Sequence, residues 1–381
     1  MQDATRHYIN GGWVASIDGR EMAVENPSTE EKIATITLGG AADADAAVAA
    51  AKAAFPAWAA TDPLDRIAAL ERLMEVYKGQ AEDMAQAISF EMGAPIALAR
   101  TAQVGAGAGH LKNTIRTAKG FAFERPLGDH APCDMILYEP VGVCALITPW
   151  NWPMNQVMLK VAPALAAGCT MVLKPAEQAP LSAVLLAEMI DAAGFPPGVF
   201  NLVNGDGAGV GAHLTAHPDV NMVSFTGSTR AGVAISKAAA DTVKRVSLEL
   251  GGKGANIIFA DADEKAVTRG VRHCFNNSGQ SCNAPTRMLV ERSIYDQAIE
   301  TARAVAEKTE VGPADIEGRQ IGPVVSETQF NKIQYLIKRG IDEHATLIAG
   351  GLERPDGLNR GHFVRPTIFA DVTPEMTIWK E

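Results

Sequence analysis

Three side chains of the sequence could together attack a carbonyl group. A thiol ends the block GQSC at Cys282, a carboxylate stands in LELGGK at Glu249, and an amide stands in PWNWP at Asn151. A thiolate can act as a nucleophile, a carboxylate as a general base, and an amide N–H can stabilise an oxyanion. Each residue alone is also compatible with a buried thiol, a strand-end carboxylate or a turn asparagine. In combination they predict covalent catalysis through Cys282.

Two further blocks could supply groups that bind a cofactor. KPAE contains Lys174 and Glu177, and FTGS contains Gly227 and Ser228; both follow strand-like runs. A helix that begins at Ser228 would offer unpaired N–H groups to phosphate, and the serine would also serve as its N-cap. The block GAGVGA, which begins at Gly207, formally fits the dinucleotide fingerprint but lacks an acidic residue about twenty positions further on. It is either a glycine-rich helix start or a phosphate neighbour.

The sequence predicts no metal site. His213 and His217 have the spacing of a zinc helix, but Leu214 stands where a metalloprotease needs glutamate. We therefore interpret this pair as surface or core residues, because a zinc site needs further ligands. The block GGKG at 251–254 lacks the leading glycine and the trailing Ser or Thr of a phosphate loop.

Composition indicates a globular protein that acts on small molecules. The 381 residues include 34 basic and 44 acidic side chains, which gives a formal net charge of −10. Because there is no basic run, we expect neither a nucleic acid nor a membrane surface as partner. There is no signal-like N-terminus and no apolar run of about 18 residues. We expect a cytoplasmic protein whose five scattered cysteines are free thiols: Cys133, Cys144, Cys169, Cys274 and Cys282.

The elements that must position these residues alternate between strands and helices after residue 140. Before that point the spacing of apolar residues predicts helices over 41–59, 62–91 and 96–119, followed by a strand at 134–139. Four apolar strands are then predicted at 141–148, 170–175, 199–203 and 220–227, with helices between them. This alternation predicts a parallel, doubly wound sheet, in which ligands bind at the carboxyl ends of the strands.

A second alternating set begins after Gly251 and Gly252. Strands are predicted at 255–260, 286–291, 346–350 and 362–369, and helices at 263–277, 293–309 and 326–341. We therefore predict an α/β protein with two such domains. A Rossmann-like cofactor domain would comprise residues 1–120 and 141–251, a bridging hairpin residues 121–140, and an α/β catalytic domain residues 252–381.

Five of these blocks, in their order along the chain, resemble the NAD(P)-dependent aldehyde dehydrogenase superfamily: PWNWP, KPAE, FTGS, LELGGK and GQSC. The resemblance runs from about residue 7 to the last residue. The resemblance implies that the Cys282 thiolate attacks an aldehyde to give a thiohemiacetal. The Asn151 side chain and the Cys282 backbone N–H would stabilise the oxyanion. After hydride transfer to the nicotinamide, Glu249 would activate the water that hydrolyses the thioester to a free carboxylic acid.

The resemblance also implies the residues that bind the cofactor. Lys174 and Glu177 match the positions that bind the adenosine ribose, and a carboxylate there favours NAD, with NADP as the alternative. Ser228 would contact the pyrophosphate. Gln329 and Lys332 would line the nicotinamide ribose or else form an exposed helix face. The remaining expected contacts are Ile147, Thr148, Pro149, Trp150, Gly207, Phe225, Gly227 and Leu250.

The resemblance further implies a homodimer or homotetramer, with the hairpin at 121–140 in its interface. The chain ends at TIWKE, where the family continues with a second glutamate and a Phe-Gly-Pro block, so we expect it to be incomplete at its C-terminus relative to the family. Two alternatives remain: a non-catalytic binding or structural relative, and a coenzyme A-acylating semialdehyde dehydrogenase, against which Glu249 argues. The aldehyde is left open, since Trp150, Trp152 and Phe275 would suit either an apolar or aromatic substrate or the core.

Overall fold

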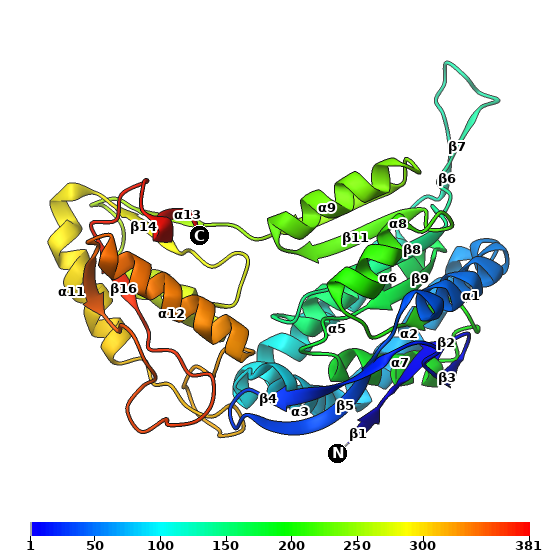
Figure 1. Cartoon of the computed structure of the whole chain (residues 1–381). Coiled ribbons are helices and arrows are strands. Elements are labelled where there is room, and N and C mark those ends of the chain that lie inside the picture. Colours follow the sequence, from blue (N-terminus) through cyan, green and yellow to red (C-terminus); the bar gives the residue numbers. More distant parts are fainter. Residues whose placement is uncertain (1) are drawn as a thin grey trace. The chain divides into compact units, whose positions relative to one another are not determined.

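The computed structural model describes residues 2–381, which divide into two compact units (Figure 1). Unit 1 comprises the residues up to 24 together with 34–87 and 100–249. Unit 2 comprises residues 25–33, 88–99 and 250–381. Among the described residues, no helix is both long and apolar enough to cross a membrane.

Unit 1 is built on a seven-stranded sheet with the order β12-β11-β8-β9-β10-β2-β3. Its strands are β2 (Arg6–Ile9), β3 (Gly12–Ala15), β8 (Val143–Ile147), β9 (Thr170–Lys174), β10 (Phe200–Leu202), β11 (Met222–Gly227) and β12 (Arg245–Leu250). Every residue of β8 and β9 is buried, as expected for parallel strands that are covered on both faces. The predicted doubly wound α/β fold is thereby confirmed.

The parallel register brings the carboxyl ends of the central strands together. Ile147 of β8 lies opposite Lys174 of β9 on one side and Phe225 of β11 on the other. β10 continues the parallel set beside β9 and pairs antiparallel with β2, which forms a hairpin with β3 at the sheet edge. The loops that follow β8, β9, β10 and β11 therefore leave the sheet from the same edge.

The helices of the first two thirds of the chain match the expected positions but not all the expected lengths. They are α1 (Ala41–Ala59), α2 (Pro63–Gly79), α3 (Ala81–Met92), α4 (Ile96–Leu98), α5 (Val104–Lys119), α6 (Pro153–Ala167), α7 (Leu181–Ala192), α8 (Ala212–Ala216) and α9 (Thr229–Ala240). The single helix expected over 62–91 is two helices, because Gln80 leaves the helical conformation with φ −113° and ψ 21°. The helix expected over 96–119 is interrupted by a π-helix, η1 (Ala99–Gln103).

Two smaller sheets complete the first part of the chain. One has the order β1-β5-β4 and contains β1 (Gln2–Ala4), β4 (Arg20–Asn26) and β5 (Glu31–Leu38). The other is an antiparallel hairpin of β6 (Glu124–Pro126) and β7 (Met135–Leu137), which extends away from the rest of unit 1 (Figure 1). The strand predicted at 134–139 corresponds to β7.

Unit 2 contains two two-stranded sheets. β13 (Ala255–Ile258) pairs parallel with β14 (Arg287–Val290), and β15 (Thr346–Ala349) pairs antiparallel with β16 (Ile368–Ala370). Its helices are α10 (Ala266–Phe275), η3 (Asn276–Gly279), η4 (Arg292–Ile294), α11 (Tyr295–Glu307), α12 (Glu327–Asp342) and α13 (Thr377–Lys380). The strand expected over 362–369 begins only after Pro366, as β16, because proline has no N–H to donate within a sheet.

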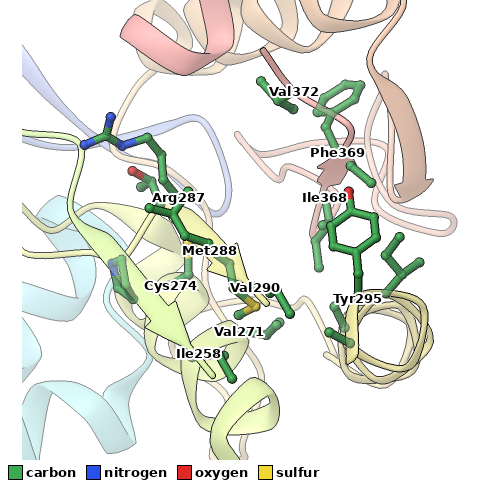
Figure 2. Close-up of a pocket in the computed structure, with 18 of the residues that line it drawn as sticks. Ile258, Val271, Cys274, Arg287, Met288, Val290, Tyr295, Ile368, Phe369 and Val372 are labelled. Atoms are coloured by element: carbon green, nitrogen blue, oxygen red, sulfur yellow. The ribbon is translucent and has the colours of Figure 1, made fainter. Parts of the chain in front are cut away.

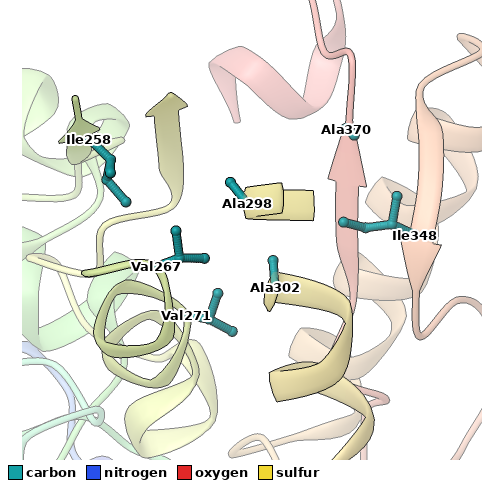
Figure 3. Packing of buried hydrophobic residues seen from close by; sticks show 7 residues of the cluster. All are labelled: Ile258, Val267, Val271, Ala298, Ala302, Ile348 and Ala370. Carbon is teal, nitrogen blue, oxygen red and sulfur yellow. The ribbon is translucent and has the colours of Figure 1, made fainter. Parts of the chain in front are cut away.

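Small aliphatic side chains form the core of unit 2 (Figure 3). The cluster consists of Ile258, Val267, Val271, Ala298, Ala302, Ile348 and Ala370. Because alanines of α11 face the valines of α10, these two helices can pack closely. This packing supports β14, whose Met288 and Val290 lie against the cluster.

Candidate active site

The loops after β8, β9 and β10 start side by side at the carboxyl edge of the unit 1 sheet. The Thr148 N–H donates to the Lys174 carbonyl at 3.1 Å, and the Val203 N–H donates to the Leu173 carbonyl at 3.0 Å. The segment 147–150 and Lys174, two parts of the expected cofactor site, are therefore neighbours. Helix N-termini and loop N–H groups at such an edge are suited to a nucleotide.

Lys174 and Glu177 form an ion pair at this edge. The Lys174 ammonium is buried and donates to the Pro175 carbonyl at 2.9 Å and to Glu177 Oε2 at 3.2 Å. Burial lowers the pKa of Lys174, and the negative charge of Glu177 acts in the opposite direction. The pair thus presents a donor and an acceptor side by side, the combination that two vicinal ribose hydroxyls require.

The block FTGS forms the end of β11 and the start of α9. Glycine is required at position 227, because a Cβ there would overlap the Phe225 ring. Ser228 caps α9 as predicted, since its Oγ accepts from the Ala231 N–H at 3.2 Å. The backbone can therefore approach a ligand closely at Gly227, next to the unpaired N–H groups of a twelve-residue helix. These features fit the pyrophosphate of a dinucleotide.

The block that begins at Gly207 forms a π-helix, η2 (Gly207–Gly211), with Asp206 as its N-cap. An Asp206 oxygen accepts from the Gly209 N–H at 2.5 Å, and its other oxygen lies 3.1 Å from Arg20 Nη2. A carboxylate already takes the position at this helix end that a phosphate would need. Of the two interpretations of GAGVGA, this geometry favours the glycine-rich helix start.

Asn151 lies in the loop between β8 and α6. The helix begins directly after it, with Trp152 as N-cap residue and Pro153 in the first turn. Proline is suited to this position because the N–H it lacks would have no partner within the helix. The main-chain carbonyl of Asn151 accepts from Gln103 Nε2 at 3.2 Å. The half-buried Asn151 is thus held between a strand end and a helix start.

Glu249 lies on β12, whose residues alternate between exposed and half-buried, and its own side chain is exposed. The buried Lys160 of α6 donates to Ser224 Oγ at 3.0 Å. Burial lowers the pKa of Lys160 to about 8, while the negative charge of Glu249 acts in the opposite direction. Lys160 is therefore within electrostatic reach of Glu249. Lys160 was not among the residues predicted from the sequence, although a lone lysine within the apolar run of α6 is a signal that could have identified it.

A strained turn in unit 2 precedes Cys282. Asn277, Ser278 and Gly279 are three consecutive residues in the left-handed region, with φ of 53°, 58° and 76°. Each non-glycine residue in this conformation costs on the order of 1 kcal/mol or more. The Ser278 hydroxyl donates to the Gly322 carbonyl at 2.7 Å, which helps to hold the turn. The polar residues before Cys282 indicate a turn after the helix, but the left-handed conformation of Asn277 and Ser278 is seen only in the structure.

Gln280 fixes the turn from the other side. Its Nε2 donates to the Asn277 carbonyl at 3.1 Å, and its Oε1 accepts from the Val325 N–H at 3.0 Å. Cys282 follows two residues later with an exposed side chain. A Cβ on Gly252 would lie 3.9 Å from the Cys282 carbonyl, so the Gly-Gly segment runs close to the thiol-bearing loop.

The other expected cofactor residues lie in unit 2. Gln329 is in the first turn of α12, where its N–H donates to Ser326 Oγ at 3.4 Å, and Lys332 is exposed one turn further on. Leu250 ends β12 and is half-buried. The structure thus places the expected residues of segments 147–150, 174–177 and 225–228 at one sheet edge of unit 1, and Cys282, Gln329 and Lys332 in unit 2.

A separate apolar cavity of about 680 Å³ lies within unit 2 (Figure 2). α10 and β14 form one side, and α11 and β16 the other. Its lining includes Cys274, whose pKa is raised by burial. None of the three proposed catalytic side chains lines this cavity.

The two histidines at helical spacing acquire a carboxylate neighbour in the structure. Asp45 Oδ1 lies 2.5 Å from His213 Nε2 and 3.3 Å from His217 Nε2. The Asp219 N–H donates to His217 Nδ1 at 3.1 Å, which places the proton of the neutral ring on the nitrogen that faces Asp45. The three side chains therefore form a hydrogen-bonded link between α1 and α8.

Comparison with known proteins identifies the family. A model of the aldehyde dehydrogenase family matches residues 13–381. A 3-succinoylsemialdehyde-pyridine dehydrogenase from a Pseudomonas species is 51% identical, over 100% of this chain and 80% of that protein.

Solved structures agree. An aldehyde dehydrogenase from Bartonella henselae is 58% identical with a TM-score of 0.99, over 100% of this chain and 80% of that chain. A Pseudomonas syringae aldehyde dehydrogenase C variant, in complex with NAD+ and octanal, is 47% identical with a TM-score of 0.97, over 99% of this chain and 77% of that chain.

Proposed function

Because the chain belongs to the aldehyde dehydrogenase family and uses NAD, we propose that it oxidises an aldehyde to the free carboxylic acid through a thioester on Cys282. The observation that carries this proposal is an exposed thiol, held by a strained turn, in a chain that also carries Glu249 and Asn151 in the matching blocks. A non-catalytic relative would have no use for this combination.

The first step is attack of the Cys282 sulfur on the aldehyde carbon. The carbonyl oxygen becomes an alkoxide, and the Asn151 side-chain amide together with the Cys282 N–H donates hydrogen bonds to it. One such donor typically contributes about 3 kcal/mol to the stability of the transition state. Bound NAD+ supplies the acceptor for the hydride that leaves the thiohemiacetal carbon.

Several groups of unit 1 would hold the cofactor for this step. Glu177 would accept hydrogen bonds from the adenosine ribose, with the Lys174 ammonium beside it, and the start of α9 at Ser228 would bind the pyrophosphate. The Glu177 carboxylate would repel a 2′-phosphate, so we propose a preference for NAD over NADP. The ion pair at 3.2 Å and the steric requirement at Gly227 support this assignment.

Hydrolysis of the thioester is assigned to Glu249. Its carboxylate would take a proton from a water molecule, which attacks the acyl carbon and releases the acid and the Cys282 thiolate. The Lys160 ammonium is within electrostatic reach of this carboxylate. A general base at this position disfavours the alternative in which coenzyme A takes up the acyl group.

The test is the formation of NADH with the 381-residue chain, NAD+ and a panel of aldehydes, without coenzyme A. We expect steady turnover, with apolar and aromatic aldehydes among the substrates, since relatives are named for a pyridine semialdehyde and one binds octanal. Cys282→Ser should abolish NADH formation and leave NAD+ binding intact. Turnover that depends on coenzyme A, or that persists in the serine variant, would refute the proposal.

We further propose a cytoplasmic homo-oligomer, a dimer or tetramer. All five cysteines are free thiols, which is typical of a reducing compartment. The β6–β7 hairpin leaves Met135 53% and Leu137 57% exposed, an apolar surface suited to a second subunit.

A further inference from the structure

One face of α5 contacts the segment that carries the proposed oxyanion donor. Gln103, Gly107 and His110 follow one another at intervals of four and three residues, so they lie along one side of the helix. All three residues lie against the segment from Asn151 to Asn155. α5 therefore supports the end of the β8–α6 loop and the start of α6 in a single contact.

The three contacts are of different kinds. Gln103 Nε2 donates to the Asn151 main-chain carbonyl at 3.2 Å, and His110 Nε2 lies 2.5 Å from Asn155 Oδ1. Between them, a Cβ on Gly107 would lie only 3.0 Å from the Met154 Cβ, so the helices are close at this point. The glycine permits the approach that the two hydrogen bonds require.

Gln103 is also the last residue of the π-helix η1. A π-turn inserts one extra residue, which rotates everything after it by about 100° relative to a continuous α-helix. Because of this rotation, Ile96 is buried before the π-turn and Gln103, at its end, is buried and faces Asn151. π-turns are rare and occur frequently at functional sites.

From this geometry we propose that Gln103 is a positioning residue for Asn151, an inference that rests on the proposed oxyanion role of Asn151. Gln103 donates to the main-chain carbonyl of Asn151, so it fixes the peptide from which the side-chain amide projects. An error of about 1 Å in a catalytic group can reduce a rate by as much as a hundredfold.

The test compares Gln103→Met with the parent chain. Methionine keeps the length of the side chain and removes the N–H donor. We expect the rate of the first NADH turnover to fall by about tenfold, because the oxyanion donor is no longer held in place. The dissociation constant of NAD+ should not change, since the hydrogen bond that Gln103→Met removes goes to Asn151, which is not one of the proposed cofactor residues. An unchanged first-turnover rate would overturn the proposal.

A double-mutant cycle separates positioning from general stability. In an Asn151→Ala background the oxyanion donor is absent, so adding Gln103→Met should slow the reaction by less than about twofold. If Gln103 only stabilised the fold, Gln103→Met would slow the first turnover by the same factor in the parent and in Asn151→Ala. That result would overturn the proposal. His110→Leu is the matched control: it removes the other hydrogen bond of this face and should lower the unfolding midpoint without coupling to Asn151→Ala.

If Gln103→Met does not fold, Gln103→Glu can replace it, because an ionised glutamate keeps the shape of the side chain without the N–H donor. We expect Gln103→Glu to change the first-turnover rate as described for Gln103→Met. If Asn151→Ala alone leaves the first turnover unchanged, the oxyanion role itself is wrong and this proposal falls with it. A slow Asn151→Ala beside a normal Gln103→Met refutes only the positioning role.

Discussion

At the scale of single residues, Glu249 provides a direct test of the hydrolytic half of the reaction. Glu249→Gln removes the proposed base and leaves Cys282 untouched. We therefore expect one equivalent of NADH per active site, followed by a stall while the thioester persists. Rapid-mixing absorbance would measure the burst, and intact mass would detect the acylated cysteine. Continued turnover at the parent rate would assign the base to another group.

Lys174 tests the cofactor assignment. Lys174→Ala removes the buried ammonium beside Glu177, so we expect NAD+ affinity to fall by about tenfold or more, with a smaller effect on the rate at saturating NAD+. Titration calorimetry would measure the affinity. Lys52→Ala is a suitable control, since it removes an exposed lysine of the same unit that pairs with Asp219. Equal NAD+ affinity in both variants would contradict the assignment.

The buried Lys160 predicts a pH dependence of stability. Its pKa of about 8 in the folded chain lies below the ordinary value of 10.5. Between these values the unfolded chain binds a proton that the folded chain does not, so this group makes the free energy of unfolding rise with pH. The free energy of unfolding of the parent and of Lys160→Met can be measured with denaturant from pH 7 to about 10.5. The parent value minus the variant value should increase with pH over this range. A constant difference would contradict the assigned shift.

At the scale of elements, replacing two glycines by alanine should change the stability of the chain in opposite directions. Gly227→Ala introduces a Cβ that overlaps Phe225 at the junction of β11 and α9, so it should destabilise the chain and weaken NAD+ binding. Gly105→Ala introduces a Cβ into open space in α5 and should stabilise it by about 0.5–1 kcal/mol. Thermal and denaturant unfolding measure both. Two changes of the same sign would show that the steric argument is wrong.

Periodicity predicted the elements well where packing and local preference agree. β8 is recognisable because it is apolar throughout, β9 because of its apolar centre, and α2 because Asp62 and Pro63 mark its start. The errors arise where tertiary contacts decide. No local signal predicts the π-turn η1, whose extra residue serves the contact of Gln103 with a loop 48 positions away.

The same distinction applies to the candidate site. Cys282, Glu249 and Asn151 could be identified from the sequence because their blocks resemble those of the aldehyde dehydrogenase family. Gln103 and Gln280 could not, since each acts through one or two hydrogen bonds to distant main-chain groups. Positioning residues of this kind become visible only once the chain is folded.

At the scale of the whole molecule, the β6–β7 hairpin predicts how subunits associate. If Leu137 lies in an interface, Leu137→Asp should reduce the mass of the assembly in light scattering, because a buried unpaired charge is unfavourable. Val243→Asp changes a 90% exposed residue outside the hairpin and should leave the mass unaltered. A parent chain that is already monomeric, or an aspartate variant with the parent mass, would contradict the role of the hairpin.

The left-handed segment Asn277–Gly279 also limits how the loop before the thiol can be redesigned. Threonine, valine and isoleucine are strongly disfavoured at positive φ, whereas asparagine and glycine are tolerated. A combinatorial library intended to change substrate preference should therefore randomise positions after Cys282 and keep these three unchanged. The conformation that presents the nucleophile thus restricts the sequence space open to engineering.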